Sequence, residues 1–188
     1  YFSKKYLLQY GLNKSKLLAH ASHHVPGVEI STGSLGHGLP IGCGVSLAYK
    51  RKKLSNHVFI INSDGEMSEG SNWEAILFAA HHKLDNLILI IDYNKLQSFG
   101  SVEHTLRIEP LSEKFLSFGW NICEVDGHNY DQIEKALLKV KKYKGKPNCI
   151  IANTVKGKGV SFMENKVKWH YKSPNDKEYA VAINELEI

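Results

Sequence analysis

Two oxygen-bearing side chains, those of Asp64 and Asn94, stand 30 positions apart, and each follows a short apolar run. A carboxylate and an amide oxygen suit a hard cation such as Mg²⁺ or Ca²⁺ better than zinc. Mg²⁺ usually completes its shell with waters and ligand phosphates, so the pair predicts a cation site that anchors a diphosphate, with the Leu96 carbonyl as a further donor. Gly65 would let the backbone approach those phosphates. Alternatively, Asp64-Gly65 is only a tight turn and Asn94 a helix-cap or left-handed residue.

The elements that must bring these two residues together are short apolar runs that alternate with helical patterns. We expect strands at Val58–Asn62, Leu87–Asp92, Trp120–Val125 and Cys149–Asn153, and helices at Leu39–Arg51, Asn72–His82, Glu113–Phe118, Asp131–Lys142 and after Pro174. This alternation predicts an α/β fold, with a mainly parallel sheet and helices on both faces. Ligands bind such sheets at the carboxyl ends of the strands. If Asn72–His82 links neighbouring strands, Asp64 and Asn94 meet within reach of one ion.

Composition narrows the class of protein. The chain has 188 residues, of which 43% are hydrophobic and 23% charged, and we expect one domain over residues 1–188. A net charge of +5 favours anionic small molecules but is too weak to indicate nucleic acid. The longest aliphatic runs, Val58–Ile61 and Leu87–Ile91, are too short to cross a bilayer. Three scattered cysteines without C-x-x-C spacing favour reduced thiols and a cytoplasmic location.

Several motifs in order resemble transketolases. They are Val25–Glu29, Ser31–Gly38, Asp64-Gly65 followed by Asn94 (the thiamine-diphosphate-binding motif), Glu69-Gly70 and Trp169-His170. The resemblance runs from about Leu17 to the last helix. It is strongest to the N-terminal, diphosphate-binding subunit of transketolases encoded as two chains. The first part of that family's N-terminal domain is absent here.

The resemblance implies a metal-binding, cofactor-binding or catalytic role for nine residues. Asp64, Asn94 and the Leu96 carbonyl would hold Mg²⁺. The cofactor-binding set would be Gly33, Leu35, Asp64, Gly65, Asn94 and His170, with Gly33 and Leu35 at the ring end of the cofactor. The catalytic set would be His170, His20 and Glu69, where the two histidines face substrate. Glu69 would lie buried at a subunit interface that links two cofactor sites, with Glu74 close by.

The family's activity sets further expectations. With thiamine diphosphate and Mg²⁺, a transketolase moves a two-carbon ketol unit from a ketose phosphate to an aldose phosphate. The carboxylate that activates the cofactor's aminopyrimidine belongs to a separate pyrimidine-binding domain. We therefore expect the partner to be a C-terminal transketolase subunit, in a dimer of heterodimers, with sugar phosphates as substrates and neither nucleic acid nor membrane involved. Two departures bear on this: Ser63 replaces the usual glycine before the motif aspartate, and Tyr171 replaces the glycine after Trp169-His170.

Other functions remain open at this point. Another thiamine diphosphate enzyme, of the 1-deoxyxylulose-5-phosphate synthase or 2-oxo acid dehydrogenase E1 type, would share the Asp64 and Asn94 motif. A non-catalytic scaffold subunit could keep the fold, although it would be expected to have lost ligands that are present here. A dinucleotide-binding module fits poorly, because the spacing of Gly33, Gly36 and Gly38 does not match G-x-G-x-x-G.

Overall fold

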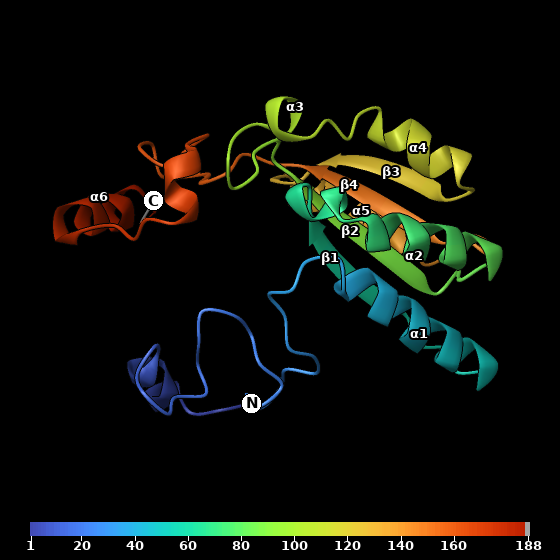
Figure 1. The fold of residues 1–188 in the computed structure, drawn as a ribbon, viewed down its shortest axis with the longest axis horizontal. Helices are drawn as coiled ribbons and strands as arrows, with labels where there is room; N and C mark the ends of the chain where they lie inside the picture. The colour runs from blue at the N-terminus through green and yellow to red at the C-terminus, as the bar shows by residue number, and fades with distance from the viewer. Residues whose placement is uncertain (187–188) are drawn as a thin grey trace.

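Four parallel strands form one sheet in the order β1-β2-β4-β3 (Figure 1). The computed structural model describes residues 1–186. The strands are β1 (Val58–Ser63), β2 (Leu87–Tyr93), β3 (Asn121–Asp126) and β4 (Asn148–Asn153). The α-helices are α1 (Gly38–Arg51), α2 (Gly70–His81), α3 (Val102–Thr105), α4 (Leu111–Ser117), α5 (Tyr130–Val140) and α6 (Asp176–Leu186). Short 3₁₀ turns are η1 (Lys4–Gln9), η2 (Gly65–Ser68) and η3 (Val167–His170).

The path of the chain explains why helices cover both faces of the sheet. It runs outward from β1 through β2 to β3, then turns back to insert β4 between β2 and β3. Right-handed crossovers place helices on opposite faces when the direction reverses. Accordingly, Leu87, Leu89 and Ile91 of β2 pack in one apolar cluster with α1, α2 and α4, whereas Ile88 packs in another with α5. The predicted α/β fold is confirmed.

The strand ends fall close to their predicted positions, with one difference at Trp120. The apolar pattern placed Trp120 in the third strand, but β3 begins at Asn121. The Trp120 ring is 1% exposed and packs against Phe115, and its indole N–H donates to the Ile76 carbonyl on α2 (3.0 Å, N to O). Trp120 therefore contacts both α2 and α4 and does not extend the strand.

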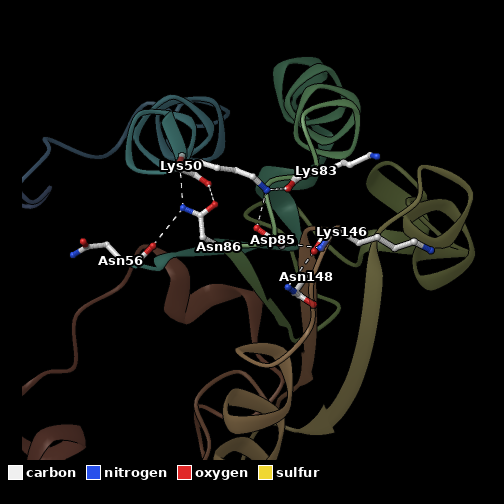
Figure 2. Close-up of polar contacts among 9 residues, drawn as sticks. Lys50, Asn56, Lys83, Asp85, Asn86, Lys146 and Asn148 are labelled. Carbon is white, nitrogen blue, oxygen red and sulfur yellow. Dashed lines mark hydrogen bonds and ion pairs between the residues drawn. The ribbon is translucent and has the colours of Figure 1, made fainter. Parts of the chain in front are cut away.

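A cluster of polar side chains lies at the end of the sheet where β2 begins, next to α1 (Figure 2). The Lys50 ammonium of α1 contacts Asp85 (2.8 Å, Nζ to Oδ1) and the Lys83 carbonyl. The other oxygen of Asp85 accepts from the Gly145 N–H (2.9 Å, O to N), and Asn86 bonds to Ser46 of α1 (2.7 Å, Oδ1 to Oγ). These contacts fix α1 against the start of β2, and so support the sheet from the end opposite to the predicted site.

The segments at both ends of the chain lie largely outside this core. Before α1, most residues are exposed, and η1 lies away from the sheet (Figure 1). Helix α6 also lies beyond the sheet (Figure 1) and is held by Glu185, which accepts from the N–H and hydroxyl of Ser161 (both 2.6 Å, O to donor atom). Within residues 1–186, no helix has the length and apolar character needed to cross a membrane.

Candidate functional site

Asp64 follows β1 directly and is almost completely buried, at 1% exposed. Its two carboxylate oxygens accept from backbone N–H groups: Oδ1 from Gly65 (2.7 Å, O to N) and Oδ2 from Lys95 (2.6 Å). The Asp64 N–H donates to the carbonyl of Asp92 on β2 (3.2 Å). Asp64 therefore lies between the ends of β1 and β2, where the sequence predicted it.

The electrostatics of Asp64 suit a bound cation. Burial raises the pKa of this carboxyl above its ordinary value, and the N–H groups of Lys95 and Gly65 oppose that shift. Asp92 is a second carboxylate close by and adds to the rise. A cation at Asp64 would offset the desolvation of the buried charge, so the donor chemistry fits Mg²⁺.

The second predicted ligand, Asn94, begins a tight turn after β2. Lys95 has a left-handed backbone (φ 66°), which reverses the chain, and Asn94 Oδ1 accepts from the Leu96 N–H (3.0 Å, O to N). The backbone hydrogen bonds of this turn run from Gln97 to the Gly100 carbonyl and from Val102 to the Lys95 carbonyl. Neither uses the Leu96 carbonyl, which is the predicted third ligand.

A cleft of about 410 Å³ joins most of the predicted site residues. Seven of the nine line it: Leu35, Asp64, Gly65, Glu69, Asn94, Leu96 and His170. His170 comes from η3, which follows Asp64 by about a hundred residues in the sequence. The tertiary fold therefore gathers the predicted cation ligands, the turn that contains Gly65 and one of the predicted histidines around a single space.

The same cleft contains a residue that sequence reasoning missed, Lys156. Its ammonium lies 3.4 Å from His170 (Nζ to Nδ1). Lys156 follows β4 in the loop 154–165, where the Thr154 N–H donates to the Tyr93 carbonyl (3.2 Å, N to O) and the Val155 N–H to His128 (2.8 Å, N to Nε2). Its place after a strand's carboxyl end was the available signal. The sequence did not reveal that β4 lies beside β2.

The remaining two predicted residues, Gly33 and His20, lie together outside that cleft. Gly33 has φ of +112°, and a Cβ atom there would lie 2.7 Å from Cγ of the His20 ring. A second cavity of about 330 Å³ is lined by Gly33 and Leu35, so Leu35 borders both spaces. The glycine is required by its positive φ and by close approach of His20, whereas its contact with a cofactor stays a prediction.

The structure also shows the surroundings of Glu69 and of Ser63 and Tyr171, the two residues that depart from the family pattern. Glu69 borders the cleft and is exposed in this single chain, so its burial at a subunit interface stays a prediction. Ser63 fits the turn, because its hydroxyl accepts from the Glu66 N–H (3.1 Å, O to N). Tyr171 is 71% exposed, and its ring meets the ring of His170 edge-on (centroids 4.7 Å apart).

The chemistry of these groups suits a cation and a polyanion bound side by side. The oxygen donors of Asp64, Asn94 and Leu96 suit Mg²⁺, and the Lys156 ammonium supplies a positive charge on the same cleft. Gly65, at the start of η2, leaves the backbone accessible there. This is the donor set expected around a metal-bound diphosphate.

Comparison with known families gives a match over nearly the whole chain. Residues 5–186 match the family described as "Transketolase, thiamine diphosphate binding domain". Among curated proteins, an apulose-4-phosphate transketolase subunit of Actinobacillus succinogenes is 42% identical over 188 residues, which is 100% of this chain and 68% of the relative. A 6-deoxy-6-sulfo-D-fructose transketolase subunit of a Clostridium species is 42% identical over 161 residues, which is 86% of this chain and 58% of the relative.

Solved structures give the same likeness in three dimensions. The crystal structure of transketolase from Campylobacter jejuni superposes with a TM-score of 0.91 at 31% identity, covering 96% of this chain and 29% of that chain. Transketolase from Leishmania mexicana gives a TM-score of 0.81 at 26% identity, covering 98% and 32%. The chain thus spans about a third of these solved chains and between 58% and 68% of the two curated relatives.

Proposed function

Because this chain belongs to the family of transketolase thiamine diphosphate-binding domains, we propose that it is the N-terminal subunit of a two-chain transketolase. In this proposal it binds Mg²⁺ and the diphosphate of thiamine diphosphate and, with a C-terminal partner chain, transfers a two-carbon ketol unit from a ketose phosphate to an aldose phosphate. The observation that carries the proposal is the buried Asp64 carboxylate, which borders one cleft with Asn94, Leu96 and His170.

The cation site is the first part of the proposal. Asp64 and Asn94 supply side-chain oxygens and Leu96 its carbonyl, and Mg²⁺ held there would neutralise the cofactor's diphosphate. Gly65 lets the backbone approach the phosphates. Lys156 adds a fixed positive charge beside the diphosphate, a role that its place on the cleft supports.

The substrate side of the cleft involves His170. When bound, thiamine diphosphate supplies an electron sink for breaking and forming the carbon–carbon bond next to a ketose carbonyl. His170 hydrogen-bonds substrate oxygens and assists proton transfer there. The Lys156 ammonium lies 3.4 Å from Nδ1 of the His170 ring, so both side chains can contact the same substrate oxygens. His20, packed on Gly33, and Glu69 act at the edges of the site.

The proposed assembly needs a partner, because an aminopyrimidine-activating carboxylate is assigned to another domain. Two relatives are named as transketolase subunits, which supports a heteromer. We propose two such pairs, in the cytoplasm, with residues 1–188 acting as one cofactor-binding domain. The relative from Actinobacillus succinogenes is named for apulose 4-phosphate, and a phosphate-bearing ketose is also our proposed donor class.

Two measurements test the proposal on the full-length protein with its co-purified partner. Calorimetry should detect thiamine diphosphate binding in the presence of Mg²⁺ and its loss when the metal is chelated. The complex should then transfer a ketol unit between sugar phosphates, whereas neither chain does so alone. Binding that is indifferent to chelation would contradict the metal site. Pyruvate-dependent turnover without ketol transfer would instead place the chain with another thiamine diphosphate enzyme.

A further inference from the structure

Two hydrogen bonds attach the glycine loop (residues 33–37) to η2, which follows Asp64, and to the start of α2, and both are made to the backbone of Gly36. The Glu66 carboxylate accepts from the Gly36 N–H (3.0 Å, Oε1 to N). The Ser71 hydroxyl donates to the Gly36 carbonyl (2.7 Å, Oγ to O). Both polar backbone groups of one residue are therefore held, the N–H by η2 and the carbonyl by the first turn of α2.

The contact at Gly36 is too close for any side chain. Gly36 is buried and has φ of +76°. A Cβ atom there would lie 2.4 Å from the Ser71 hydroxyl oxygen and 2.8 Å from Cβ of Glu69. The loop thus rests directly on the start of α2, and its distance from that helix is set by van der Waals contact as well as by the two hydrogen bonds.

Glu66 is itself fixed to the same turn as the proposed metal ligand. It follows Asp64 by two residues within η2, and its N–H donates to the Ser63 hydroxyl. Its carbonyl accepts from the Asn72 side chain (2.7 Å, O to Nδ2). A carboxylate anchored in this way can transmit the position of the Asp64 turn to the loop.

We propose that Glu66 is a positioning residue that docks the loop 33–37 onto the Asp64 turn, and so shapes the cleft wall for thiamine diphosphate before the cofactor arrives. Leu35, next to Gly36, borders the cleft that Asp64 also borders. Glu66 itself borders the neighbouring cavity and not the cleft, so it acts through Gly36 and Leu35. The inference rests on the proposed cofactor function, but the docking of the loop can be measured without any cofactor.

The experiment compares Glu66→Ala with Glu66→Gln in the full-length protein. Gln keeps a carbonyl oxygen that accepts from Gly36, whereas Ala removes the acceptor. In the cofactor-free protein, hydrogen exchange of the amides at 34–37 should accelerate in Glu66→Ala and stay near wild type in Glu66→Gln. In calorimetry with saturating Mg²⁺, thiamine diphosphate should bind about tenfold or more weakly to the Ala variant, as expected for loss of a hydrogen bond to a charged group.

Two further variants make the outcome specific. Ser71→Ala removes the other hydrogen bond at Gly36 and should change both readouts in the same direction, which keeps the test usable if Glu66→Ala folds poorly. Glu134→Ala, an exposed substitution on α5, should change neither. Unchanged exchange in Glu66→Ala and Ser71→Ala, or a Gln variant as impaired as Ala, would overturn the docking role.

The cofactor part of the inference has its own refutation. Faster loop exchange with wild-type cofactor affinity would show that docking does not prepare the cleft. If the wild-type complex binds no thiamine diphosphate, the proposed function fails together with this cofactor part, while the exchange measurements still decide whether Glu66 docks the loop.

Discussion

Replacing Asp64 by Asn separates the metal site from the fold. The substitution keeps the shape of the side chain and one acceptor oxygen, but it removes the negative charge that Mg²⁺ would contact. Removing one partner of a buried charge pair costs about 3–5 kcal/mol, and about 1.4 kcal/mol corresponds to a factor of ten in affinity. We therefore expect thiamine diphosphate to bind the variant about a hundredfold or more weakly at a Mg²⁺ concentration that saturates wild type.

The same substitution should leave the metal-free fold nearly as stable. Because burial raises the pKa of Asp64, its contribution to stability is full below the ordinary carboxyl pKa of about 4 and is lost as the pH rises through the higher folded value. A neutral Asn avoids that loss at pH 7. It also gives up one of the two N–H contacts, which is worth about 1 kcal/mol. The two effects oppose each other.

Calorimetry of Asp64→Asn checks the expected loss of cofactor affinity, and denaturant unfolding checks the expected stability of the metal-free fold. Asp131→Asn, an exposed substitution on α5, is the matched control for both. Wild-type cofactor affinity in the Asp64 variant would refute the metal assignment. A metal-free variant that loses its cooperative unfolding transition would refute the reasoning about stability, because it would show that the two N–H contacts outweigh the buried charge.

Three other substitutions test the site and its support. His170→Ala should lower the turnover of the complex more than its cofactor affinity, measured by initial rates and calorimetry; unchanged turnover would remove it from the catalytic set. Lys156→Gln should weaken thiamine diphosphate binding about tenfold at low salt and less at high salt, since solvent-accessible charges are screened, and a salt-independent loss would argue against a charge effect. Burial opposes the shift, but the Gly145 N–H and the Lys50 ammonium hold the pKa of Asp85 below its ordinary value. Its contribution to stability is therefore present above about pH 4 and lost as the pH falls through the folded value. Urea midpoints of wild type and Asp85→Asn should accordingly converge in acid, and a constant gap from pH 7 to pH 3 would contradict this.

The strands, and the placement of Asp64 and Asn94 at neighbouring strand ends, could be predicted from the sequence because their causes are local. β2 carries an unbroken apolar run since both of its faces are covered, and that pattern ends where the polar residues of the site begin. Asp64 and Asn94 each follow such a run, and one helix separates them. That spacing predicts neighbouring parallel strands, and the pairing of β1 with β2 confirms it.

Other parts of the site depended on contacts between distant segments. Lys156 reaches the cleft because β4 inserts beside β2, and the apolar pattern of β4 does not say which strands it pairs with. The ring of His20 lies against Gly33, outside the cleft, and its predicted contact with substrate stays a prediction. Its neighbours carry no periodic pattern that would fix where its ring lies.

The amino-acid sequence by itself determined the elements, the parallel sheet and the pair of oxygen donors, because apolar periodicity and strand-end position act over a few residues. Only the tertiary structure decided the strand order β1-β2-β4-β3 and the contact between His170 and Lys156 in the cleft. It also decided the hydrogen bonds of the glycine loop to Glu66 and Ser71. Those features arise from the packing of surfaces that lie far apart along the chain, and packing is specified by all of the contacting side chains together.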